Sequence, residues 1–230
     1  MHIGGYKWVG GLCIAAFLAV SSPAEATDRK SERRALIFGD SQLYGEFGSA
    51  MHELMRARGY SVETHAVCSA SSFTFLKDWE TPCGYKVRRS TAAQSKPRTW
   101  YLNGKRKVPS IRALLKRRPE VVILVLGTNN GTTPHNARRF AQRLLRRIFA
   151  KSTVKRVYWV GPPTFRGEKD RLTPNLVRAI RTFDRAAFID SRPFNTGKPL
   201  PRSHEHFGRM KARRWASWVF ARMRSSLPNS

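Results

Sequence analysis

The sequence lacks an apolar run that would span a membrane comfortably. The candidate, Trp8–Val20, is rich in glycine and falls short of the roughly 20 residues that a spanning helix needs. With Lys7 before it and Ala24-Glu25-Ala26 after it, the stretch is typical of a secretion signal. We therefore predict a signal peptide over residues 1–26, cleaved after about Ala26, and a soluble protein that is periplasmic or secreted.

Cysteine is scarce. The chain has three, and Cys13 would leave with the signal peptide, because Gly10-Gly11-Leu12 before it does not match a lipoprotein signal. The two that remain, Cys68 and Cys83, would meet an oxidising compartment, which favours a disulfide between them over two unrelated thiols. In the chain-entropy account, closing a loop of this length stabilises a fold by roughly 3 kcal/mol.

Acidic residues are also few: 15 Asp and Glu stand against 43 Lys and Arg, for a formal net charge of +28. Removing residues 1–26 leaves the charge unchanged, since that segment holds one Lys and one Glu. Such a surface attracts polyanions. For an exported protein we expect anionic cell-envelope polymers or lipid headgroups as partners, and no nucleic acid. Alternatively, the charge serves only to keep the surface hydrated.

The length suits one domain with a sizeable core, which we place at residues 27–230 after a polar lead-in, Thr27–Arg33. A basic loop insertion is expected at about residues 73–118. From Lys86 to Arg118 it has twelve Lys or Arg, no acidic residue, and the aromatic pair Trp100 and Tyr101. Long loops are usually functional or disordered. This one either grips a sugar polymer or is a solvated excursion, and the sequence leaves both readings open.

Short apolar runs alternate with segments of helical periodicity along the rest of the chain. This alternation predicts a parallel sheet with helices on both faces. The expected strands are Ala35–Phe38, Tyr60–Val67, Val121–Leu126, Val157–Val160 and Ala186–Ile189. The expected helices lie between about Tyr44 and Gly59, at His135–Lys151, from Thr173-Pro174 onward, and at Arg209–Arg224.

Three of these elements carry residues with possible chemistry. The stretch Ala35–Gln42 ends in Gly39-Asp40-Ser41, where a glycine allows a sharp turn and a serine stands at the carboxyl end of a strand. In an open α/β sheet that edge faces the ligand crevice. Val121–Asn130 is a second buried-strand run and ends in Gly-Thr-Asn-Asn. His206-Phe207-Gly208 leads into the last helix.

In order and spacing these motifs resemble the SGNH (GDSL-type) hydrolases, and the resemblance runs from about Arg34 to Trp218. It implies a flavodoxin-like three-layer α/β/α fold with a central parallel sheet of about five strands. It also implies that Ser41 is the nucleophile and His206 its general base. The oxyanion hole would consist of the Ser41 N–H, the Ser69 N–H and the Asn129 side-chain amide, with no cofactor and no metal.

The sequence departs from the family pattern at two positions. Ser69 stands where the family has a glycine that donates its N–H, with Ala70 as an alternative register. Ser203 stands where the family usually has the aspartate that orients the histidine. Ser203 itself could hold the ring of His206 as part of a Ser–His dyad, whereas Asp190 is a distant substitute. His204 competes with His206 for the role of base, but the residues after His206 resemble the family's closing block.

From these residues we expect an exported serine esterase that removes acyl groups from a cell-envelope carbohydrate, and acetyl is the acyl group that we expect. Its substrate would be an acylated carbohydrate or another ester, and the protein would be a monomer. Two alternatives stay open. One is an O-acyltransferase that uses the same serine, and the other is a catalytically degenerate SGNH fold that binds an anionic envelope polymer.

Overall fold

The computed structural model describes Met1 and residues 32–77, 79–129, 134–163, 173–195 and 206–228. The chain divides into two units, Met1–Ser31 and Glu32–Ser230, and only the second is described below. Apart from Met1, the expected signal peptide lies outside the described residues. Ser203 and His204 lie outside them too. Within the described part of the chain, no helix combines the length and the apolar character needed to cross a membrane.

A seven-stranded sheet forms the centre of the second unit. Its strands are β1 (Arg34–Gly39), β2 (Ser61–Val67), β4 (Tyr85–Ser90), β5 (Arg98–Leu102), β7 (Val121–Val125), β8 (Arg156–Val160) and β9 (Ala186–Ile189). Their order in the sheet is β5-β4-β2-β1-β7-β8-β9. The five strands from β2 to β9 are parallel, and β4 and β5 are antiparallel additions at one edge. The predicted five-stranded parallel sheet is confirmed, and its strand order is that of flavodoxin-like folds.

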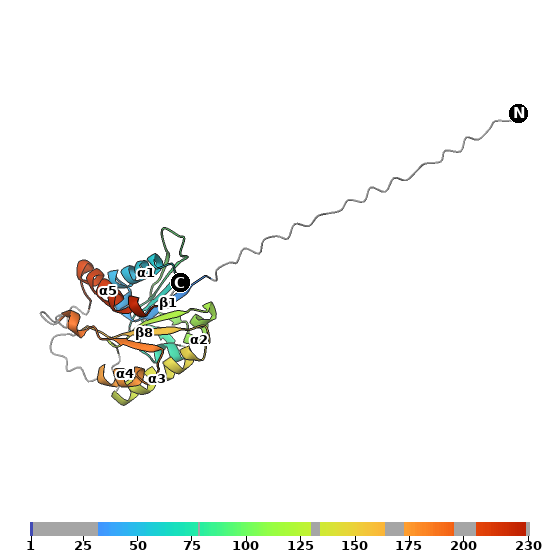
Figure 1. Ribbon diagram of the computed structural model, residues 1–230. Coiled ribbons are helices and arrows are strands. Elements are labelled where there is room, and N and C mark those ends of the chain that lie inside the picture. The colour runs from blue at the N-terminus through green and yellow to red at the C-terminus, as the bar shows by residue number, and fades with distance from the viewer. Residues whose placement is uncertain (2–31, 78, 130–133, 164–172, 196–205, 229–230) are drawn as a thin grey trace. The chain divides into compact units, whose positions relative to one another are not determined.

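Helices cover both faces of this sheet, as Figure 1 shows. On one face α1 (Glu46–Ala57) packs beside α5 (Arg209–Met223), over side chains such as Ile37, Ile123 and Tyr158. On the other face lie α2 (Ile111–Leu114), α3 (Pro134–Phe149) and α4 (Thr173–Ile180), over Phe38, Leu124 and Trp159. Alternate residues of each strand serve opposite faces, so the apolar runs build two cores and the predicted three-layer α/β/α fold.

Short 3₁₀ helices connect several of these elements. They are η1 (Ser41–Leu43), η2 (Thr74–Leu76), η3 (Leu115–Arg117), η4 (Arg192–Asn195) and η5 (Arg224–Ser226). One of them, η1, directly follows β1, so the chain turns at Ser41 before α1 begins at Glu46. The expected end of α1 is also seen, because Gly59 has φ +81°, a left-handed conformation that suits glycine after a helix.

The region expected to be a basic loop contains regular structure. Besides β4 and β5 it holds β3 (Trp79–Thr81) and β6 (Arg106–Val108), which pair as a separate two-stranded sheet. Thus the insertion extends the main sheet, and most of its exposed cations stand on strands or on their connecting turns. Its β-structure escaped sequence analysis because charged residues interrupt the two-residue apolar alternation that marks a strand.

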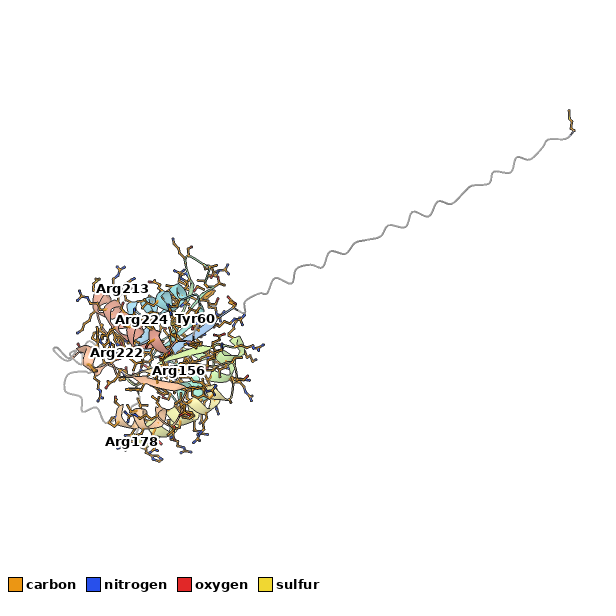
Figure 2. The ribbon with its side chains drawn as sticks, in the orientation of Figure 1. Tyr60, Arg156, Arg178, Arg213, Arg222 and Arg224 are labelled. Carbon is orange, nitrogen blue, oxygen red and sulfur yellow. A yellow bond between two sulfur atoms is a disulfide. The ribbon has the colours of Figure 1, made fainter. Side chains whose placement is uncertain are left out.

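The cations are also spread over the outer helices. Figure 2 shows Arg178 on α4 and Arg213 and Arg222 on α5, and the side chains of these three residues are exposed. Exposed cations therefore lie on α4 and α5 as well as on the insertion, so charge alone does not identify a binding site.

Candidate active site

The end of β1 is held unusually close to β7. A Cβ atom at Gly39 would lie 2.0 Å from the carbonyl oxygen of Val125, closer than any real contact, and the next residue, Asp40, donates its N–H to that oxygen at 3.1 Å. Gly39 is not one of the glycines with a positive φ. The sequence analysis was therefore wrong about why glycine is needed here: the close approach of β7 requires it, rather than a sharp turn.

Ser41 begins η1 immediately after this contact. The buried Asp40 caps the turn, since its Oδ1 accepts a hydrogen bond from the Gln42 N–H at 3.0 Å. Capping fixes the backbone at the first turn. As a result the half-buried Ser41 side chain stands at the carboxyl edge of the sheet, where open α/β sheets bind their ligands.

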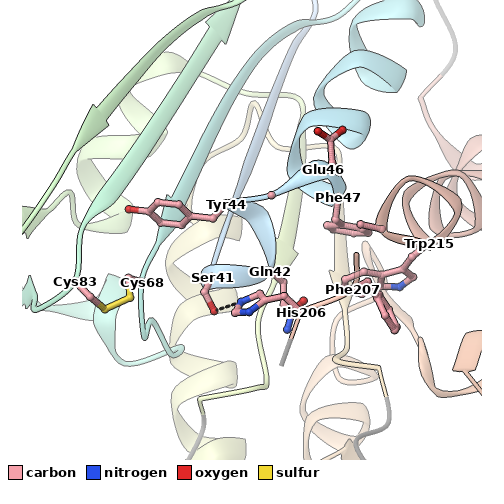
Figure 3. Close-up of a pocket in the computed structure, with 12 residues that line it drawn as sticks. Ser41, Gln42, Tyr44, Glu46, Phe47, Cys68, Cys83, His206, Phe207 and Trp215 are labelled. Atoms are coloured by element: carbon pink, nitrogen blue, oxygen red, sulfur yellow. Dashed lines mark hydrogen bonds between the residues drawn. A yellow bond between two sulfur atoms is a disulfide. The ribbon is translucent and has the colours of Figure 1, made fainter. Parts of the chain in front are cut away.

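His206 meets Ser41 from the far end of the chain. Its Nε2 lies 2.9 Å from the Ser41 hydroxyl oxygen, although the two residues are 165 positions apart (Figure 3). The neighbouring Phe207 fixes the position of the exposed imidazole. Its buried ring packs edge-on against Trp215 at 5.5 Å and Phe194 at 5.7 Å between ring centroids. Packing of α5 thus brings the histidine to the serine.

For the serine to react, Nε2 of His206 must accept its proton, which places the other ring proton on Nδ1. Among the described residues, no carboxylate forms a hydrogen bond or ion pair with His206. Asp190, the distant substitute, is bound to Arg192 through contacts of 2.6 and 2.8 Å. Burial raises the pKa of Asp190, but the hydrogen bonds from Arg192 outweigh it and hold that pKa below its ordinary value.

Ser69 has a backbone conformation that non-glycine residues rarely adopt. Its φ is +59°, in the left-handed region where glycine is favoured, and only Arg118 shares this feature among the described non-glycine residues. Ala70, the alternative register, does not have a positive φ. The assignment of Ser69 as the donor stays a prediction. The Ser69 side chain is exposed and its hydroxyl contacts the sulfur of Cys83 at 3.6 Å.

Asn129 connects the end of β7 to the same segment. Its Nδ2 donates to the Ala70 carbonyl oxygen at 3.3 Å. An amide group has two N–H donors, so this bond uses one of them and orients the side chain beside Ser69. Neither Ser69 nor Asn129 is among the described residues that line the cavity at Ser41, although Cys68, the neighbour of Ser69, does line it.

Cys68 and Cys83 form the predicted disulfide, with their Cα atoms 5.6 Å apart. The bridge joins the end of β2 to the turn before β4, directly beside Ser69. It also forms part of the cavity wall (Figure 3).

The cavity at Ser41 and His206 has a volume of about 300 Å³. Its floor consists of aromatic side chains from α1 and α5, where the rings of Phe47 and Trp215 stack at 3.8 Å between centroids. Tyr44, a wall residue that sequence analysis did not single out, is fixed from behind because Lys86 Nζ donates to its carbonyl oxygen at 2.6 Å. Burial raises the pKa of the Tyr44 hydroxyl, so this group stays protonated at neutral pH.

Sequence patterns gave no signal that these aromatic residues line a cavity. Phe47 and Trp215 also belong to the core between the helices and the sheet, and a cavity floor of this kind cannot be distinguished from core in a sequence. Within the described residues, no group of three or more His, Cys, Asp or Glu side chains is arranged to hold a metal ion.

The fold and the site together define a class of α/β protein: a flavodoxin-like sheet with a hydrogen-bonded serine–histidine pair at its carboxyl edge. No protein-family model matches the chain, and no curated protein matches it in sequence. Solved structures do match its fold.

A DUF4886 family protein from Bacteroides uniformis superposes with a TM-score of 0.56 at 12% identity, over 86% of this chain and 87% of the other. A family two carbohydrate esterase from Cellvibrio japonicus gives 0.53 at 15% identity, over 84% of this chain and 61% of the esterase. A peptidoglycan O-acetylesterase gives 0.50 at 12% identity, over 85% and 91% of the two chains. At these identities the likeness is one of fold, and the chain spans about three fifths of the Cellvibrio enzyme.

Proposed function

We propose that this protein is a serine esterase that removes an acyl group, acetyl in the simplest case, from a carbohydrate. The observation that carries the proposal is the 2.9 Å contact between Ser41 Oγ and His206 Nε2 at a cavity on the carboxyl edge of the sheet. A serine hydroxyl is a weak nucleophile until a base takes its proton. In the proposal, His206 is that base.

In the proposed reaction Ser41 Oγ attacks the ester carbonyl carbon while its proton passes to His206 Nε2. The carbonyl oxygen becomes an oxyanion, for which the N–H groups of Ser41 and Ser69 and the second amide N–H of Asn129 are the proposed donors. Collapse breaks the bond to the sugar oxygen, which takes the proton from His206. Water then attacks the acyl-serine by the same route and restores the hydroxyl.

Two features support a carbohydrate ester as substrate and a site of action outside the cytoplasm. The solved structures that share the fold include a carbohydrate esterase and a peptidoglycan O-acetylesterase. The Cys68–Cys83 disulfide suits an oxidising compartment. These features favour an envelope carbohydrate, with the protein periplasmic or secreted.

One observation favours a second candidate. No described carboxylate supports His206, and loss of the orienting acid in other triads costs about 10⁴-fold in turnover. The second candidate is therefore a degenerate fold that binds its ligand without turnover. An acyltransferase would use the same acyl-serine but transfer the group to a sugar hydroxyl, so its product would depend on an added acceptor.

The test is a comparison of wild type, Ser41→Ala and His206→Ala on p-nitrophenyl acetate and with a fluorophosphonate probe. We expect wild type to react with both. Ser41→Ala should lose all labelling and at least about 10³-fold in kcat, with an unchanged unfolding midpoint. Full activity in either variant would contradict the mechanism, and an inert wild type would favour the binding protein.

A further inference from the structure

Two further cavities lie apart from the one at Ser41, on the side of the sheet that β4 and β5 extend. One, of about 490 Å³, opens between the starts of β1 and β2 and the strands β4 and β5. The other, of about 690 Å³, opens between β4, β6 and α2. They adjoin along Glu63, Arg89 and Arg117, which line both, and together they are called the basic cleft here.

Cations outnumber acids in the described wall of the basic cleft. Six line it: Arg34, Arg89, Arg98, Lys107, Lys116 and Arg117. Two carboxylates, Glu32 and Glu63, are already engaged, the first with Arg34 at 3.2 Å. Among the described residues, Arg98, Lys107 and Lys116 have no carboxylate partner and are exposed. These three are available to a negatively charged ligand.

A buried chain of hydrogen bonds holds the centre of the cleft. Glu63 Oε1 accepts from Arg89 at 2.8 Å and from His65 Nε2 at 2.7 Å, and its Oε2 forms an ion pair with Arg117 Nε at 3.5 Å. His65 Nδ1 in turn meets the Tyr85 hydroxyl. Burial raises the pKa of Glu63, but the hydrogen bonds from His65 and Arg89 outweigh it and lower that pKa to about 2.

This chain is a costly way to build a core, because buried polar groups lose their hydration and apolar residues would stabilise the site as well. Its effect is to hold the half-exposed Arg89 at the wall of the cleft, with the more exposed Arg117 paired to the same carboxylate. Preorganised donors of this kind suit bidentate binding of carboxylate or phosphate.

The register of the strands places two arginine side chains opposite each other. Arg89 on β4 lies directly opposite Arg98 on β5, and Glu63 lies opposite Arg89 on its other side. Like charges that face each other across a ladder are destabilising. One glutamate serves Arg89, while Arg98 has no such partner among the described residues. An anionic group between the two arginines would relieve the repulsion.

An aromatic ring stands beside this pair. Trp100 follows Arg98 by two residues on the same face of β5, about 7 Å further along the strand. Its side chain is 41% exposed and lines the cleft. Apart from Met1 and Met210, the exposed large apolar side chains of the described residues are all on β5. A flat ring next to a cationic pair suits a sugar ring that carries a negative group.

We propose that the basic cleft binds a strand of anionic polysaccharide, separately from the catalytic cavity. Arg34, at the cleft, is five residue steps along β1 from Gly39, beside the nucleophile, which corresponds to about 17 Å. A strand held here would be anchored while another part of it reaches Ser41. The choice of a glycan over other polyanions rests on the proposed function.

The test is the binding of polygalacturonate, a carboxylated polysaccharide, to protein that also carries Ser41→Ala. The triple change Arg98→Gln, Lys107→Gln and Lys116→Gln removes three exposed charges without touching the Glu63 chain. We expect it to weaken binding roughly tenfold at physiological ionic strength, where screening limits longer-range attraction. The matched control, Arg138→Gln, Arg139→Gln and Arg143→Gln on α3, removes the same charge elsewhere and should change binding by less than about twofold.

Two further measurements sharpen the result. Trp100→Ala should weaken polygalacturonate binding roughly fivefold, through loss of ring contact. Dextran, a neutral glucan, should bind at least about tenfold more weakly than polygalacturonate, because it lacks the charge that the arginines recognise. Equal loss in the two triple variants would overturn the proposal in favour of general charge attraction.

The identity of the occupant is tested with two competitors. Tighter binding of single-stranded DNA or of phosphatidylglycerol vesicles than of polygalacturonate, with loss in the same triple variant, would overturn a glycan occupant. The outcome is independent of catalysis. An inert Ser41 with intact, cleft-dependent polymer binding contradicts the proposed esterase alone, while esterase activity with cleft-independent binding contradicts the cleft alone.

Discussion

Ser69 has a left-handed backbone conformation, which is unfavourable for a residue that carries a side chain. An L-residue in the left-handed region costs about 1–2 kcal/mol relative to right-handed backbone, yet the structure has φ +59° here. If this position serves through its N–H, the side chain contributes little to the chemistry.

We therefore expect Ser69→Gly to keep full esterase activity and to raise the free energy of unfolding by about 0.5 kcal/mol. The gain is small because the unfolded glycine is more flexible. Urea unfolding and p-nitrophenyl acetate turnover measure the two effects. A large fall in kcat with the fold intact would show that the hydroxyl, rather than the N–H, matters.

Gly39 has a different reason to be glycine. Gly39→Ala would place a methyl group 2.0 Å from the Val125 carbonyl oxygen, so the two strands must move apart. We expect a loss of about 3 kcal/mol, at the upper end for overpacking because backbone must shift. Activity should fall too, since Ser41 follows directly. Gly208→Ala is the control, because nothing lies within 4 Å of its added Cβ, and its urea midpoint should change little by comparison.

At the scale of elements, the Cys68–Cys83 bridge closes a loop over a sequence separation of 15. Replacing both cysteines by alanine should reduce the free energy of unfolding by about 3 kcal/mol in the chain-entropy account. Turnover should fall as well in chains that remain folded, since the bridge holds the segment that carries Ser69. Urea unfolding and kcat are measured for the double alanine variant and for wild type with and without reductant. Unchanged kcat in the folded variant would show that Ser69 needs no tether.

The parallel core could be predicted element by element because its strands are buried on both faces and appear as continuous apolar runs, such as Val121–Val125. The edge strands could not. In β5 most side chains are exposed, and its cations and aromatics interrupt alternation. Pairing with β4 makes it a strand, and that is a tertiary effect absent from local sequence.

The candidate site shows a similar division. Ser41, Ser69 and Asn129 follow strands, so their position at one edge followed from the parallel topology and the family pattern. Tyr44 gave no signal, because a tyrosine between a turn and a helix has no distinctive pattern, and its place in the cavity wall depends on Lys86 from a strand that was not predicted.

At the scale of the whole molecule, acid should destabilise the fold through a buried histidine. His52 is fully buried between Thr64 and Ser90, and burial first, then Arg88 and Arg56, lower its pKa to about 3 from 6.5. Below pH 6.5 the unfolded chain therefore binds a proton that the folded chain does not. Stability that is complete above pH 6.5 is lost progressively as the pH falls toward 3.

Between pH 6.5 and 5 the loss from His52 should be about 2 kcal/mol. His52→Gln should flatten this dependence, whatever its effect on stability at neutral pH, because glutamine does not titrate. The exposed His135→Gln is the control and should keep the wild-type slope. Urea unfolding at pH 7.5, 6 and 5 checks the three slopes. An equal slope in His52→Gln and wild type would show that another group governs acid unfolding.

The 165 positions between Ser41 and His206 also have a consequence in time. At synthesis rates of about 5–20 residues per second, roughly 10 to 30 s pass between the appearance of the proposed nucleophile and that of its base. During that interval the serine belongs to a chain without a partner for its proton. A chain halted before α5 would contain the serine and all seven strands of the sheet, yet it would lack the helix whose packing brings His206 to Ser41. The proposed chemistry therefore begins only when the last helix has been made and has docked.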